Sequence, residues 1–257
     1  GQLDDVDSML AELDDSEVEP SPVLEGKLLA VRTWLADARG EPRPIETAER
    51  ALTLLPEGAV LYRILAFITL SHARTEAGDM LGSTEALRDA YRLATDADQS
   101  FAAMGALANL AFNLLEQGKR REALALCKAA CARTTDDRDR PLPVLGLVYL
   151  PMATAYYMGD DLDRAEHYAR EGLALCRDLF SGAMAGGDAE RVLARVTFAR
   201  GEHDAALTFL EEARLSAESR GITHVALVFA ATSAMLRLRL GEAAPVGRWP
   251  SVSSRAT

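Results

Sequence analysis

The sequence predicts an all-α fold, an α-solenoid of about five to six helical hairpins that form a right-handed superhelix. Ile and Val together number only 17 of the 257 residues, few for a protein with a large sheet, whereas Ala and Leu are abundant. Apolar residues recur every three or four positions, in runs that glycines interrupt. These runs repeat along the chain with a period of about 40 residues, which is typical of stacked helical repeats.

One copy of the repeat lies between residues 110 and 130. An apolar run continues to Leu115, Gly118 interrupts it, and a second amphipathic run follows at once. This order predicts a helix, a short turn and a second helix. Gly suits the turn because the end of a helix commonly needs a residue in the left-handed conformation.

Small residues mark the start of the second helix in each copy. Ser83, Ala123, Ala165 and Ala206 occupy equivalent positions, and their separations are 40, 42 and 41 residues. Two helices can cross at about 8–10 Å only where such small residues lie between them. The spacing therefore predicts a tight contact within each hairpin.

Less complete copies lie at both ends of the repeat array. Residues Arg32–Gly40 and Ile45–Leu55 are expected to be one helix pair, and Val225–Leu240 a last first helix. Most prolines fall between these elements, as the missing N–H requires. Pro151 falls inside a predicted helix, where we expect a kink. Long loops are expected at residues 133–143 and 181–188.

Three segments are predicted along the chain, and the first is distinguished by its charge. Residues 1–19 carry eight acidic side chains and no basic one, and their apolar residues recur as in an amphipathic helix. This acidic helix is expected either to cover the open end of the solenoid or to dock on a preceding module or a basic partner surface. Residues 20–245 are the predicted repeat domain, and residues 246–257 an irregular tail or a truncated repeat.

Composition also limits the classes of function. The net charge of −11 argues against nucleic-acid binding by this chain, because phosphate contacts need clustered Lys and Arg. The longest mostly apolar stretch, Val144–Met158, has 15 residues and is too short to span a membrane. Without a signal peptide or a cysteine framework, a cytoplasmic location is expected.

Catalytic and metal-binding patterns are weak in this sequence. Cys127 and Cys131 lie four residues apart without further ligands nearby, so we expect them to be small buried hydrophobes. The four histidines are scattered over separate repeats, and no nucleophile motif is found. We therefore expect no enzymatic activity, no cofactor and no metal.

The repeats carry a family resemblance. The Gly-x-x-x-x-Ala turn and the ending Ala51-Leu-Thr-Leu-Leu-Pro56 resemble tetratricopeptide repeats. The period near 40, together with the stretches Ala48–Pro56 and Leu193–Gly201, is similar to the elongated repeats of MalT-like bacterial transcriptional regulators. These regulators are large ATP-dependent activators of the LuxR type, and the resemblance covers about residues 24–245.

The resemblance implies that this chain is the sensor-type repeat domain of such a regulator. That domain receives an inducer and communicates with an ATPase module, and the full-length protein ends in a DNA-binding helix-turn-helix. Neither module is visible in this sequence: the stretch Gly182–Gly187 lacks the lysine of a phosphate-binding loop. The chain alone should bind neither ATP nor nucleic acid, and self-association is a further expectation.

The first helices of stacked hairpins line a concave groove, which is the predicted ligand site. Offsets from Ala111, taken to face its partner helix, select a mixture of aromatic, acidic, basic and hydroxyl side chains that suits a polar ligand. The predicted groove residues are His72, Glu76, Phe112, Glu116, Thr154, Tyr157, Arg191, Arg195, Phe198, Met235 and Arg239.

Two interpretations of Arg191 and Arg195 are open. Four residues apart on one helical face, they could clamp a carboxylate or a phosphate. They could equally pair with Asp188 or Glu190.

Two functions are likewise open. The first is an effector-sensing and interaction domain of a MalT-like regulator, binding a small inducer or a partner in the groove. The alternative is a tetratricopeptide adaptor that binds a peptide or protein partner and is unrelated to transcription.

Overall fold

A computed structural model describes residues 20–39, 41, 44–132, 142–179 and 187–242, together with residues 8 and 10. Within these residues the secondary structure is entirely helical, with no strand. Apart from residues 8 and 10, which are helical, the predicted acidic helix at residues 1–19 lies outside the described residues. The tail at residues 246–257 also lies outside them, as do most of the two predicted loops.

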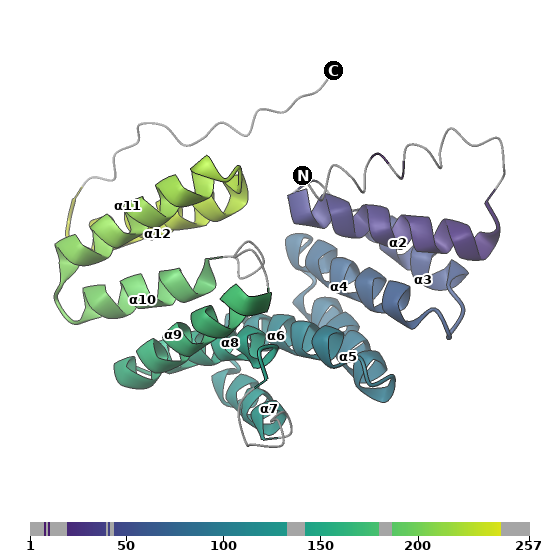
Figure 1. Cartoon of the computed structure of the whole chain (residues 1–257), viewed down its shortest axis with the longest axis horizontal. Coiled ribbons are helices and arrows are strands. Elements are labelled where there is room, and N and C mark those ends of the chain that lie inside the picture. Colours follow the sequence, from purple (N-terminus) through teal and green to yellow (C-terminus); the bar gives the residue numbers. More distant parts are fainter. Residues whose placement is uncertain are drawn as a thin grey trace. The chain divides into compact units, whose positions relative to one another are not determined.

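The described chain forms successive helices that pair as hairpins (Figure 1). The consecutive helices α2/α3, α4/α5, α8/α9 and α10/α11 contact each other as pairs, α6 and α7 lie between the second and third of these pairs in the chain, and α12 comes last. Their bounds are α2 (Pro22–Arg39), α3 (Ile45–Leu54), α4 (Val60–Glu76), α5 (Met80–Asp96), α6 (Ser100–Glu116), α7 (Arg120–Cys131), α8 (Leu145–Tyr157), α9 (Leu162–Leu179), α10 (Asp188–Ala199), α11 (His203–Ser219) and α12 (Thr223–Arg239).

The chain divides into two compact units, residues 1–126 and residues 127–257. In the first unit each helix from α2 to α6 contacts the next, and α4 also contacts α2 and α6. In the second unit each helix from α8 to α12 contacts the next, and α10 also contacts α8 and α12. Contacts between alternate helices are the pattern of stacked hairpins, so the predicted solenoid is confirmed within each unit.

Seven of these helices end in the same pair of hydrogen bonds. At the end of α6, the Gly118 N–H donates to Leu115 O at 2.9 Å, and the Lys119 N–H donates to Leu114 O at 2.8 Å. This is the Schellman motif, which requires a left-handed residue, and Gly118 has a φ of +74°. Glycines with a positive φ end α4, α10, α11 and α12 in the same way.

Two of the seven turns use aspartate in place of glycine. Asp98 after α5 has a φ of +54°, and Asp160 after α8 has a φ of +60°. A β-carbon makes the left-handed conformation costly, although Asp tolerates it better than most residues. The repeat is therefore visible in the backbone even where the sequence lacks its glycine.

The small residues predicted at the helix crossings are buried. Ser83, Ala165 and Ala206 are 0% exposed, and Ala123 is 1% exposed. One close approach within a hairpin lies between α8 and α9. A β-carbon added to Gly146 would lie 3.0 Å from Gly172 O, so only glycine permits this backbone contact.

Pro151 lies inside α8, as predicted, and is buried. Its ring nitrogen carries no hydrogen, so the helix loses one internal hydrogen bond at this point.

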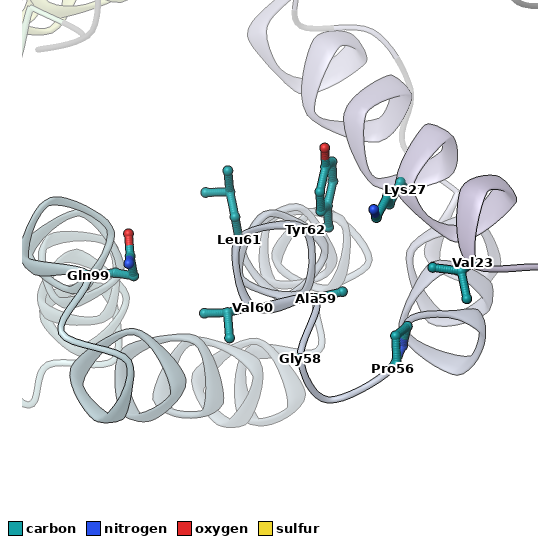
Figure 2. Close-up of a pocket in the computed structure, with 9 residues that line it drawn as sticks. All are labelled: Val23, Lys27, Pro56, Gly58, Ala59, Val60, Leu61, Tyr62 and Gln99. Carbon is teal, nitrogen blue, oxygen red and sulfur yellow. The ribbon is translucent and has the colours of Figure 1, made fainter.

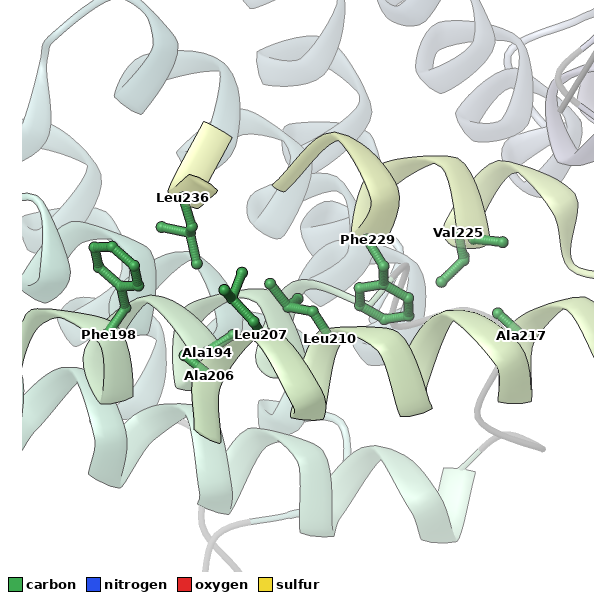
Figure 3. Packing of buried hydrophobic residues seen from close by; sticks show 10 residues of the cluster. Ala194, Phe198, Ala206, Leu207, Leu210, Ala217, Val225, Phe229 and Leu236 are labelled. Atoms are coloured by element: carbon green, nitrogen blue, oxygen red, sulfur yellow. The ribbon is translucent and has the colours of Figure 1, made fainter. Parts of the chain in front are cut away.

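Phe198 corrects one groove prediction. It is only 9% exposed and belongs to the core cluster of the second unit, with Leu207 and Leu236 among its members (Figure 3). Its ring centroid lies 4.4 Å from that of His203. The reason is helical geometry, since Phe198 lies four residues after the fully buried Ala194 and therefore shares its inward face.

A substitution at the left-handed turns tests the Schellman assignment. Gly118→Ala should lower the free energy of unfolding by about 1–2 kcal/mol, because the new β-carbon strains a positive φ. Asp98→Gly should raise it by roughly 0.5 kcal/mol, because it removes such strain. Urea denaturation measures both changes, and equal effects of the two substitutions would contradict the assignment.

A second pair of substitutions tests the contact between α8 and α9. Gly146→Ala should lower the free energy of unfolding by about 1–3 kcal/mol, because its methyl group overpacks the helix crossing. Gly105→Ala is the matched control, since its β-carbon meets no atom within 4 Å. In the control a helical glycine is replaced in open space, so stability should rise by about 0.5–1 kcal/mol. A neutral result for Gly146→Ala in thermal or urea melts would refute the tight crossing.

Candidate functional site

The predicted groove residues lie on first helices from α4 onward and on α12. Four lie on α4 and α6 in the first unit, and the others lie on α8, α10 and α12 in the second unit. The structure therefore divides the prediction into two groups, each with its own chemistry.

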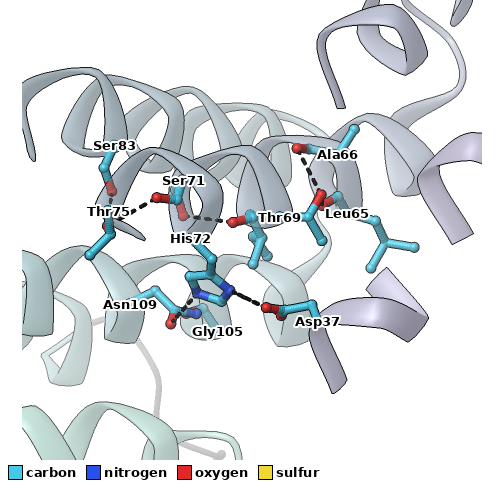
Figure 4. A network of polar contacts seen from close by, with 11 residues as sticks. Asp37, Leu65, Ala66, Thr69, Ser71, His72, Thr75, Ser83, Gly105 and Asn109 are labelled. Carbon is cyan, nitrogen blue, oxygen red and sulfur yellow. Dashed lines mark hydrogen bonds and ion pairs between the residues drawn. The ribbon is translucent and has the colours of Figure 1, made fainter. Parts of the chain in front are cut away.

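In the first unit, His72 links three successive first helices (Figure 4). Its Nδ1 lies 3.0 Å from both carboxylate oxygens of Asp37 on α2. Its Nε2 lies 3.2 Å from Oδ1 of Asn109 on α6. The Asn109 amide nitrogen donates to Gly105 O at 3.0 Å, which leaves its oxygen to face the histidine. Both ring nitrogens therefore face acceptors, an arrangement that a doubly protonated ring satisfies.

His72 was among the residues predicted from the sequence, whereas its partners Asp37 and Asn109 were not. The two missed residues lie 35 residues before and 37 residues after the histidine. They thus occupy equivalent positions in consecutive repeats, and a comparison of first helices at this spacing could have found them.

The other predicted residues of the first unit lie on the same helices. Glu76 on α4 and Glu116 on α6 are exposed, and Phe112 is half-buried. Glu76 lies one turn beyond His72, so the two share a helical face.

A hydrogen-bonded network joins α4, α5 and α6 in this unit. Asn113 donates to Ser83 Oγ at 2.8 Å and accepts from Thr84 Oγ1 at 2.7 Å. Ser83 Oγ in turn lies 2.8 Å from Thr75 Oγ1, as Figure 4 shows. Asn113 is buried, and these bonds satisfy its polar atoms, which fixes the helices with directional contacts.

In the second unit, three predicted residues lie on adjoining helices. Tyr157 is the last residue of α8, and Arg191 and Arg195 lie one turn apart on α10. The Arg195 guanidinium carbon lies 5.9 Å from the centroid of the Tyr157 ring, a cation–π contact. Arg191 instead pairs with Asp188, at 2.5 Å between its terminal nitrogen and Oδ1. The pairing with Asp188 is therefore the correct interpretation for Arg191 and not for Arg195.

The electrostatics of this group are unusual. Burial raises the pKa of Asp188 to about 6, and this effect exceeds the opposing one of Arg191. Burial also lowers the pKa of Arg195, and the neighbouring charges of Arg191 and Arg239 lower it further. Within the described chain, Arg195 has no carboxylate within ion-pair distance. Two like charges therefore act on Arg195, which has no ion pair of its own among the described residues.

The remaining predicted residues of this unit, all within the described chain, make no hydrogen bond or ion pair with this group. Thr154 donates its hydroxyl to Leu150 O at 3.2 Å, within its own helix. Met235 is 46% exposed, and Arg239 at the end of α12 is also exposed. Two buried atoms of α10, Arg191 Nε and Glu190 Oε2, have no hydrogen-bond partner.

The first unit also contains a cavity of about 390 Å³, which was not predicted from the sequence (Figure 2). Its lining is mostly apolar and includes Val23, Leu61 and Tyr62, with Lys27 and Gln99 as the polar side chains. The Lys27 amine lies 5.3 Å from the centroid of the Tyr62 ring. This volume is within the range of small-molecule sites.

The cysteines lie in environments that suppress reactivity. Burial raises the pKa of the Cys127 thiol to about 12 and that of the Cys176 thiol to about 11. Cys127 is 1% exposed, as expected of a small buried hydrophobe. Within the described ranges, no three His, Cys, Asp or Glu side chains are grouped so that they could hold a metal ion. No helix among the described residues is long and apolar enough to cross a membrane.

Comparisons with known proteins agree with the fold. The apo form of RapI is similar over 91% of this chain and 82% of its own, with a TM-score of 0.61 and 13% sequence identity. BtubC (BKLC) from P. vanneervenii is similar over 96% of this chain and 93% of its own, with a TM-score of 0.51 and 16% identity. No curated protein sequence matches the chain significantly. The family described as MalT-like TPR region matches residues 26–253, and the chain therefore belongs to this family.

Proposed function

We propose that this chain is the effector-sensing and interaction domain of a MalT-like transcriptional regulator. The observation that carries the proposal is the incompletely compensated group of arginines on α10 and α12, in a chain of the MalT-like TPR family. A half-buried cation without a hydrogen-bonded anion is costly, so such a group is suited to a ligand.

A ligand at this group contacts several repeats at once. Tyr157, Arg195 and Arg239 belong to α8, α10 and α12, and α10 contacts both of the other helices. A ligand that bridges them stabilises one arrangement of these helices over others, in proportion to its difference in affinity for the two. In the full-length protein this change is proposed to reach an ATPase module and a DNA-binding helix-turn-helix, or to promote self-association, in the cytoplasm.

The adaptor function is the second candidate, and the apolar cavity of the first unit favours it. Leu61 in its lining is 54% exposed, and Phe101, which follows the cavity residue Gln99 by two positions, is 47% exposed. Exposed apolar side chains of this kind are typical of surfaces that bind peptides or protein partners.

A thermal-shift screen of metabolite classes with the purified chain tests the sensing function. A ligand at 100 times its dissociation constant should stabilise the fold by about 2.7 kcal/mol, which raises the melting temperature. Tyr157→Ala should weaken the inducer response of the intact regulator, because the Tyr157 ring contacts Arg195 in this group. Phe209→Ala on α11, a second helix, is the control. If no metabolite class shifts melting and Tyr157→Ala leaves the response unchanged, the sensing function is wrong.

A further inference from the structure

We propose that the arginine cluster, Arg191, Arg195 and Arg239 beside Tyr157, binds the carboxylate or phosphate group of a small metabolite. The inference rests on the proposed function and names the chemical class of its effector as an anion.

All three arginines of the cluster lie on helices, and no loop contributes to it. Arg191 and Arg195 are one turn apart on α10, so both project from the same helical face. Arg239 comes from α12, which contacts α10, and its charge acts on Arg195. The helices that carry these side chains pack against one another, which holds the side chains in place before a ligand binds.

The cluster contains more positive than negative charge. Asp188 pairs with Arg191 and also faces Arg195, and Glu190 is the other acid near it. Glu190 additionally acts on Cys176, on the side of α9. Neither acid lies within ion-pair distance of Arg195, and among the described residues Arg239 makes no ion pair. Three guanidinium groups therefore share one bonded carboxylate.

An anionic ligand compensates this excess of positive charge better than the carboxylates that the described chain supplies. The Tyr157 ring contacts Arg195 by a cation–π interaction, and among the described residues the guanidinium N–H groups of Arg195 make no hydrogen bond, so they can donate to a ligand. Carboxylates and phosphates accept two parallel hydrogen bonds from such an edge. Arg191 has one terminal nitrogen bonded to Asp188, while its Nε has no partner. Asp188 thus accepts from only some of the hydrogen-bond donors of the Arg191 side chain.

The experiment uses the purified chain with inorganic phosphate and with succinate, each compared with sodium chloride at equal ionic strength. Both melting temperature and calorimetric binding are measured. We expect at least one anion to raise the melting temperature above that in chloride. A response to phosphate alone assigns a phosphate-bearing metabolite, and a response to succinate alone assigns a carboxylate; either outcome supports the proposal.

Substitutions locate the binding. Arg195→Gln should weaken anion binding about tenfold or more, because a hydrogen-bonded charge is lost. Arg239→Gln should weaken it by a smaller factor. Arg237→Gln is the matched control on the same helix, since Arg237 already pairs with Glu242 at 3.0 Å, and binding should be unchanged.

Two further readouts separate a ligand site from a structural role. Without anion, Arg195→Gln should melt no lower than the wild type, because it removes repulsion between like charges. Asp188→Asn should strengthen anion binding severalfold, because the competing carboxylate is gone.

The proposal is overturned if neither anion exceeds chloride, or if Arg195→Gln and Arg237→Gln weaken binding equally. If neutral metabolites still raise the melting temperature in that case, the sensing function stands. Only the anionic class would then be wrong.

Discussion

The close contact between the two helices of each hairpin is the constraint on which the rest of the structure depends. Where α8 crosses α9, Gly146 and Gly172 bring the backbones so close that a β-carbon would overlap its neighbours. Ser83, Ala165 and Ala206 are fully buried on the second helices of their hairpins, and Ala123 on α7 is 1% exposed. This contact fixes the orientation of each first helix. The orientation in turn determines which of its side chains face the core and which face solvent.

Much of the fold could be predicted from the sequence because it repeats. Glycine turns and buried small residues recur at a nearly constant spacing, and both depend on local geometry. The turns at Asp98 and Asp160 show the limit of this approach, since aspartate adopts there a conformation for which only glycine is a clear signal.

The site was harder to predict because side-chain direction depends on small differences of helical register. Phe198 was predicted to line the groove from its closeness to Arg195, but it lies four residues after Ala194 and enters the core. The partners of His72 come from two other repeats, which no pattern within one helix reveals.

The link through His72 has a mechanical consequence. Repeat arrays are stabilised by contacts between nearest neighbours, so their end repeats can open while the rest stays folded. One imidazole that holds Asp37 on one side and Asn109 on the other joins α2, α4 and α6 into a single cooperative segment. Loss of the first hairpin must break the bond between Asp37 and His72, and the same imidazole ring bonds Asn109 of the third hairpin, so opening at this end is coupled to the contact between α4 and α6.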